Sequence, residues 1–91
     1  MHQLGILAHS QGDLDGAQRL FNDSLTIAQE LGDQNDIAIS FYALGTLAVD
    51  RGNKVEAERL FSEALAIFRK LRSPHAETVR QRLERMKSKT S

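Results

Sequence analysis

Apolar residues recur along this chain at intervals of three and four positions, the spacing that gathers side chains on one face of an α-helix. Four stretches with this spacing span about residues 13–31, 34–51, 53–71 and 74–88, and the residues before Gly12 form a fifth. No stretch alternates strictly between apolar and polar positions, as a strand with one buried and one exposed face would. The pattern therefore predicts an all-α protein. In the stretch 13–31 the predicted apolar face consists of Ala17, Leu20, Phe21, Ser24, Leu25, Ala28 and Leu31.

Residues that start and stop helices separate these stretches. Gly52 is expected to end one helix, because glycine readily takes the left-handed conformation that often follows a helix C-terminus. Asn53 is then expected to cap the next helix, with Glu56 three positions later as in a capping box. On the exposed side of that helix, Arg59 and Glu63 are four residues apart and are expected to pair. Similar signals are Gly32 before a cap at Asp33 or Asn35, and Ser73 before Pro74.

The chain repeats itself at an offset of 40 residues. Of the 28 residue pairs from 4/44 to 31/71, 12 are identical without a gap, whereas chance would give about two. Arg59-Leu60-Phe61, for example, repeats residues 19–21. We therefore predict a single domain over residues 1–88. It comprises one repeat at about 1–33, a second at about 34–72, a last helix at about 74–88, and a disordered tail at 89–91.

The repeated unit resembles the tetratricopeptide repeat. That family's signature places Leu-Gly three residues after an aromatic, followed later by Ala-x-x-x-Phe. The second unit has Phe41-x-x-Leu44-Gly45 and then Ala57-x-x-x-Phe61, and the first unit has Met1-x-x-Leu4-Gly5 and then Ala17-x-x-x-Phe21. The resemblance implies an α-solenoid of antiparallel helical hairpins, with two repeats and a C-terminal capping helix. It also implies that the glycines allow close helix approach and that Phe21 and Phe61 fill the space between units.

This chain departs from the usual signature in three respects. Ala8 and Ala48 stand where an aromatic is expected after Leu-Gly, and the proline expected after the second helix is absent. The period is 40 residues instead of 34. The longer period resembles the variant found in kinesin light chains and in bacterial regulators with tetratricopeptide repeat domains.

The resemblance further implies a concave wall lined by the first helix of each unit. The lining positions would be His2, Ile6, His9, Ser10, Tyr42, Thr46, Val49 and Asp50. Tyr42 is the expected anchor for a bound peptide or helix, although all of these positions are also compatible with an ordinary exposed surface. Because no Lys or Arg occurs among them, we do not expect the variant of this wall that grips a C-terminal carboxylate.

The first hairpin is expected to have an uncovered side, because Met1 already occupies the first motif position and no unit precedes it. We therefore expect a non-catalytic protein–protein interaction scaffold that self-associates through this hairpin, as a homodimer. The alternative is that the chain is a fragment of a larger regulator that binds a peptide or helix in its concave groove. In both cases the partner is a protein or peptide.

Charge is distributed unevenly along the chain. Residues 1–68 hold ten acidic and four basic residues, a balance of −6, and residues 69–91 hold two acidic and eight basic residues, a balance of +6. This basic end can be an ordinary solvated helix face, or it can be a handle for an acidic partner. Nucleic acid is the less favoured partner, because no aromatic residue lies among the basic ones for base stacking. The handle consists of Arg80, Arg82, Arg85 and Lys87.

Catalytic, metal-binding and cofactor-binding signals are weak. The chain has no cysteine, and its three histidines, His2, His9 and His75, lack the spacing of a metal site. No nucleophile–base arrangement or phosphate-binding glycine loop can be recognised. No signal peptide or stretch of apolar residues long enough to span a membrane is seen. We therefore expect a cytoplasmic protein that is not an enzyme, binds no metal or cofactor, and has no membrane partner.

Overall fold

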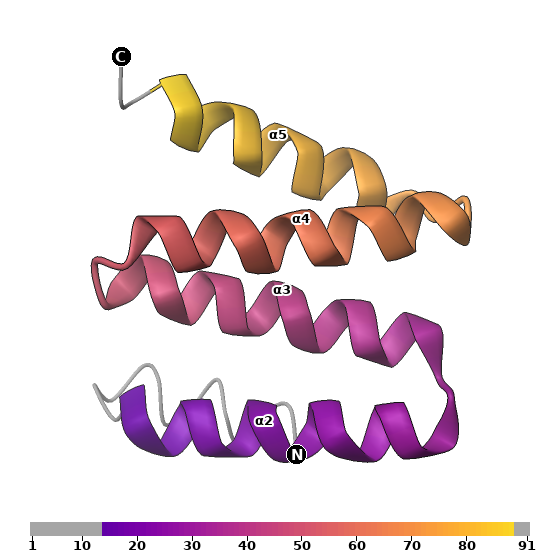
Figure 1. Ribbon diagram of the computed structural model, residues 1–91. Coiled ribbons are helices and arrows are strands. Elements are labelled where there is room, and N and C mark those ends of the chain that lie inside the picture. Colours follow the sequence, from indigo (N-terminus) through magenta and orange to yellow (C-terminus); the bar gives the residue numbers. More distant parts are fainter. Residues whose placement is uncertain (1–13, 89–91) are drawn as a thin grey trace.

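The computed structural model describes residues 14–88 as four helices that run antiparallel in chain order (Figure 1). They are α2 (Leu14–Leu31), α3 (Gln34–Asp50), α4 (Lys54–Lys70) and α5 (His75–Ser88). The main contacts join each helix to the next, α2 to α3, α3 to α4 and α4 to α5. Over residues 14–88 this arrangement confirms the predicted all-α solenoid of helical hairpins. The expected tail at residues 89–91 lies outside this range.

The α3–α4 turn has the structure that its sequence predicts. Gly52 adopts a φ of 77°, and the N–H of Asn53 donates to the carbonyl of Ala48 at 2.8 Å. This pattern satisfies carbonyls that the end of α3 would otherwise leave unpaired. The side chain of Asn53 then accepts a hydrogen bond from the backbone N–H of Glu56 and caps α4. The α2–α3 turn repeats these features at Gly32, Ala28, Asp33 and Asp36.

Phe61 is the centre of the described core, and its side chain is fully buried. A Cβ atom placed on Gly45 would lie only 2.7 Å from the Phe61 ring, so the absence of a side chain on α3 allows α4 to approach this closely. The ring of Tyr42 packs on the same phenylalanine, with 5.3 Å between the ring centroids. Phe21, 40 residues earlier, is also buried. The predicted roles of Phe61 and Gly45 are therefore confirmed, whereas Gly5 lies outside the described residues.

Leu31 was wrongly assigned to the buried face of its helix. Its side chain is 76% exposed, because it is the last residue of α2 and the chain turns away immediately after it. Leu71, 40 residues later, follows the last residue of α4 and is also exposed. A periodic pattern identifies the face of a helix, but it does not show where the neighbouring helix stops covering that face.

Arg59 makes a different ion pair from the predicted one. Its guanidinium donates to both carboxylate oxygens of Glu56, at 3.0 and 2.8 Å, instead of pairing with Glu63. The carboxylate of Glu56 is therefore bound by Arg59, and of the capping box only the Asn53 half is formed. Both side chains are largely exposed, so this pair contributes little to stability.

Helix α5 occupies the place in the series that α3 would take one repeat later. Its apolar face packs against α4, with Val79 and Leu83 buried and Ala76 and Met86 partly buried, as predicted for the last helix. The positions 40 residues after the buried Ile37, Leu44 and Leu47 of α3 are instead exposed and charged. They are Glu77, Glu84 and Lys87. This polar outer face is the feature that the capping-helix prediction requires.

Candidate functional site

A groove runs between α3 and α5, and its first part is an apolar hollow of about 240 Å³. The half-buried ring of Tyr42 lies on the α3 side. On the α5 side the ring of His75 packs against Phe68 of α4, with 5.4 Å between the ring centroids. The hollow is therefore walled by rings and aliphatic groups that can receive an apolar side chain. Its lining residues are Ile39, Tyr42, Phe68, His75, Thr78 and Val79.

The second part of the groove is a hollow of about 560 Å³ at the other end of the same two helices, and it is basic. Val49 contributes an apolar wall and is 36% exposed. Three cationic side chains surround it, and none of them forms an ion pair within residues 14–88. The residues that line this hollow are Val49, Gly52, Lys54, Arg82, Arg85 and Met86. We call the two hollows together the α3–α5 groove.

Arg82 is held in place at the middle of the groove. Its guanidinium carbon lies 5.7 Å from the centroid of the Phe61 ring, within the range of a cation–π contact. Because Phe61 also contacts Tyr42, one buried phenylalanine positions both the aromatic and the cationic side chain of the groove. Thr46 is partly buried one turn beyond Tyr42, and its hydroxyl donates to the Tyr42 carbonyl at 3.1 Å.

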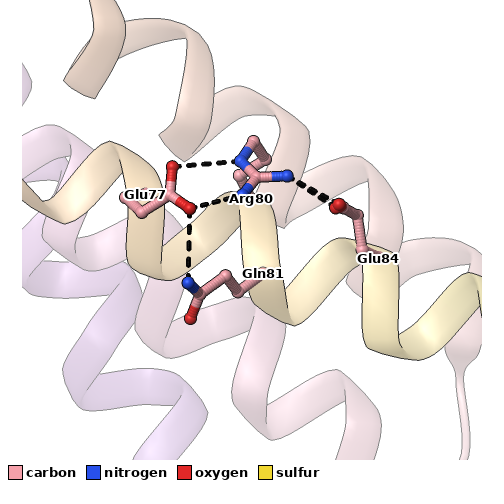
Figure 2. Close-up of polar contacts among 4 residues, drawn as sticks. All are labelled: Glu77, Arg80, Gln81 and Glu84. Atoms are coloured by element: carbon pink, nitrogen blue, oxygen red, sulfur yellow. Dashed lines mark hydrogen bonds and ion pairs between the residues drawn. The ribbon is translucent and has the colours of Figure 1, made fainter.

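Arg80 differs from the other arginines of α5, because two carboxylates of the same helix bind it. Figure 2 shows its guanidinium between Glu77 and Glu84, with Gln81 also donating to Glu77. The hydrogen bonds to Glu77 and then to Glu84 raise the pKa of Arg80 above its usual value. The same contact with Arg80 is the largest cause that lowers the pKa of Glu77. The charge of Arg80 is thus already balanced within its helix.

Some residues of the predicted wall and of the predicted basic handle come together in the groove, and others lie elsewhere. Tyr42 and Val49 line the groove, Thr46 lies between them on α3, and Asp50 is exposed at the end of the helix. Within the proposed basic handle, Arg82 and Arg85 join this groove, Arg80 is paired with glutamates, and Lys87 is exposed on α5. The remaining wall positions lie outside the described residues: His2, Ile6, His9 and Ser10.

The wall and the basic handle were predicted as unrelated sites, and several lining residues were not predicted at all. The missed residues are Ile39, Phe68, His75, Thr78 and Val79 in the apolar hollow, and Lys54 and Met86 in the basic one. Extending the 40-residue offset beyond residue 71 is the signal that was overlooked. It aligns Tyr42 with Arg82 and Ile39 with Val79, and so places these α5 residues beside the α3 wall.

A metal cluster and a membrane-spanning helix are both absent from the part of the chain that the structure describes. Residues 14–88 contain no group of three or more His, Cys, Asp or Glu side chains placed to hold a metal ion. Of the helices formed by these residues, none combines the length and the apolar character that crossing a bilayer requires. The α3–α5 groove combines an apolar hollow with three cations, and for that reason we take it as the candidate site among the described residues.

Comparison with known proteins gives one match. The family model of the tetratricopeptide repeat matches residues 1–70, which include both repeats and stop before α5. No curated protein matches this sequence, and no solved structure matches it either. The match therefore covers most of the chain but provides no individual relative whose partner can be compared.

Proposed function

This chain belongs to the tetratricopeptide repeat family, and from that membership we propose that it is a non-catalytic domain that binds a peptide or helix of another protein in the α3–α5 groove. Domains of this family generally mediate protein–protein interaction. The observation that supports the choice of surface is the pairing of an apolar hollow around Tyr42 with the exposed apolar side chain of Val49, both facing α5. Binding sites commonly combine such apolar surface with a few placed polar groups.

Selection of peptides tests this proposal. The full chain is immobilised and used to select from a phage-displayed library of random 12-residue peptides. We expect enriched peptides to bind the wild type in solution, to shift the amide NMR signals of α3 and α5, and to bind the Val49→Glu variant weakly. Val55→Glu is the matched control, because Val55 is 80% exposed on α4 and does not line the groove. If no peptide is enriched, or if both variants bind equally well, the groove is not the binding site.

Self-association through the N-terminal hairpin is the second candidate, and exposure of the edge of α2 favours it. Ile27 is 49% exposed, whereas Ile67, its counterpart 40 residues later, is partly buried against the core. Likewise, Leu60 is buried, but its counterpart Leu20 on α2 is only half-buried. A second copy that covered α2 would remove this apolar surface from water. We therefore propose homodimerisation as a further property of the chain, independent of the groove.

Light scattering coupled to size-exclusion chromatography tests this second candidate. Self-association through α2 predicts a mass that rises above the 10.2 kDa of one chain with increasing concentration, and that returns to one chain in the Ile27→Glu variant. Val55→Glu again serves as the control, because it adds the same charge on α4. A wild-type protein that remains at one chain's mass at every concentration contradicts self-association and leaves the groove proposal intact.

Nucleic acid remains the weakest of the partner classes proposed from the sequence. Binding of a duplex requires several cations that can reach phosphates; Arg80 is already bound by Glu77 and Glu84, which leaves Arg82 and Arg85 of the α5 arginines, and no aromatic residue lies beside them in the sequence to stack on bases. We therefore propose a protein partner. A gel shift with random duplex or single-stranded DNA at low salt would count against this choice.

A further inference from the structure

We infer that the α3–α5 groove recognises an acidic protein segment that carries one apolar anchor residue, with the anchor at Tyr42 and the carboxylates at Lys54, Arg82 and Arg85. The inference rests on the proposed function and specifies the chemistry of its partner. The apolar hollow and the basic hollow are lined by the same two helices, so a single bound segment can reach both.

The basic hollow is positively charged with no internal compensation. Lys54, Arg82 and Arg85 line it, and among residues 14–88 no carboxylate lies within ion-pair distance of any of them. Asp50, the one acidic residue of the predicted wall, is outnumbered by these three cations. Complementary charge is what distinguishes partners at such a surface.

Arginines with no ion pair among the described residues occur on the side of α5 that faces the groove, whereas Arg80 on the outer side is paired. The same helix carries Glu77 and Glu84, and both are used to bind Arg80 on the outer side. Arg82 and Arg85 face the hollow without such partners. The arginines of α5 are therefore divided between one that is balanced within the helix and two that remain available for an external anion.

Arg82 is also positioned for recognition before any partner arrives. Its contact with the ring of the fully buried Phe61 restricts the side chain to the groove wall. A guanidinium held in this way loses less conformational freedom on binding than a free one, and its planar donors suit a carboxylate. The anchor hollow is equally preformed, because Phe68 and His75 pack against each other at its far side.

The distance between the apolar hollow and the basic hollow determines how far apart the anchor and the acidic residues of the partner can lie. Tyr42 and Val49 are seven residues apart on α3, which corresponds to about 10 Å along a helix axis. An extended segment covers that distance in about three residues, and a helical one in about two turns. Because Arg82 contacts the same Phe61 ring as Tyr42, the preferred partner places its acidic residues within about three positions of the anchor if it is extended, or within about seven if it is helical.

Peptide selection on charge variants tests the inference. The library of random 12-residue peptides is selected on the wild type, on the double variant Arg82→Gln/Arg85→Gln, and on the control Arg19→Gln/Lys70→Gln. The control removes the same net charge at exposed positions outside the groove. Wild type and control should enrich peptides with an apolar residue and at least two acidic residues, and the groove variant should not. Synthetic wild-type-selected peptides with amidated C-termini should bind the groove variant at least about tenfold more weakly.

Each other outcome has a defined meaning. If peptides bind the groove but show no excess of acidic residues, the proposed function stands and the acidic partner is wrong. If amidation abolishes binding, the cations hold a C-terminal carboxylate and the inference is overturned. If no peptide is enriched on any protein, both proposals fail. Because Arg82 contacts Phe61, circular dichroism must show that the groove variant is folded, and Arg85→Gln alone provides a second variant that leaves this contact in place.

Discussion

Replacing Arg72 by glycine should stabilise this protein, although it removes a side chain. Arg72 has a φ of 54°, in the left-handed region that costs an ordinary residue about 1–2 kcal/mol. It stands 20 residues after Gly52, and the backbone bonds of its turn match those after α3. The N–H of Arg72 donates to the carbonyl of Arg69 at 3.0 Å, and the N–H of Ser73 donates to that of Phe68 at 2.9 Å.

The size of the effect follows from what the substitution changes. The side chain of Arg72 is exposed, and within residues 14–88 it makes no hydrogen bond or ion pair, so its loss costs little. The substitution removes the backbone strain. Against this, glycine makes the unfolded chain more flexible, and this extra conformational entropy destabilises the folded state by about 0.5–1 kcal/mol. The net gain should be about 0.5–1 kcal/mol, or roughly 3–6 °C in melting temperature for a domain of this size.

Thermal melts followed by circular dichroism at 222 nm, together with urea titrations, measure this gain. Two controls fix its interpretation. Gly52→Ala should destabilise by about 1 kcal/mol through backbone strain alone, because a Cβ atom at Gly52 meets no other atom within 4 Å. Lys70→Gly, in the last helical residue of α4, should lose up to about 1 kcal/mol. An Arg72→Gly protein that melts at or below the wild-type temperature would refute the reasoning.

Two further predictions follow from the core and from α5. Phe61→Ala should cost about 3–5 kcal/mol of unfolding free energy in urea titrations, because the ring is fully buried, and a negligible change would show that the repeat register is wrong. Arg80→Gln should raise the pKa of Glu77 toward its ordinary 4.5 in an NMR titration, since Arg80 is the main cause that lowers it. Because the pKa of Glu77 is lower in the folded protein than in the unfolded chain, ionised Glu77 stabilises the fold above pH 4.5, and this stabilisation is lost as the pH falls through the pKa of the folded protein. Arg80→Gln removes this contribution, so the free energy of unfolding of the variant should fall less on acidification than that of the wild type.

Local sequence signals predicted the helices and their turns well. Gly52 and Asn53 mark a helix end and a helix start by backbone and side-chain chemistry that acts within a few residues. Phenylalanine occurs at both position 21 and position 61, and this match predicted that the two are equivalent core positions. Both are buried, because each repeat packs its second helix in the same way. The left-handed conformation of Arg72 could not be predicted from the sequence. Arg72 occupies the same place in its turn as Gly32 and Gly52 do in theirs, but it is not a glycine.

The groove could be predicted only in part, because it depends on which helices are neighbours. The resemblance to the tetratricopeptide repeat placed Tyr42 and Val49 on one wall, and charge counting found Arg82 and Arg85, but neither connects the two pairs. The connection arises when α5 packs on α4 in the place one repeat after α3. The selective pairing of Arg80 with Glu77 and Glu84 was likewise not predicted, although the spacing of three and four residues permits it.

Positions 40 residues apart differ between α3 and α5 where they face the groove, and this indicates how recognition is separated from folding. Core positions 40 residues apart keep their character, as in Ala17 and Ala57, both fully buried. Tyr42, in contrast, is matched by Arg82, and both side chains contact the ring of Phe61, one from α3 and the other from α5. A change at residue 82 affects the helix packing through the contact with Phe61. The partner's chemistry can therefore be altered at residue 82, with the stack of helices kept, where the new side chain retains that contact.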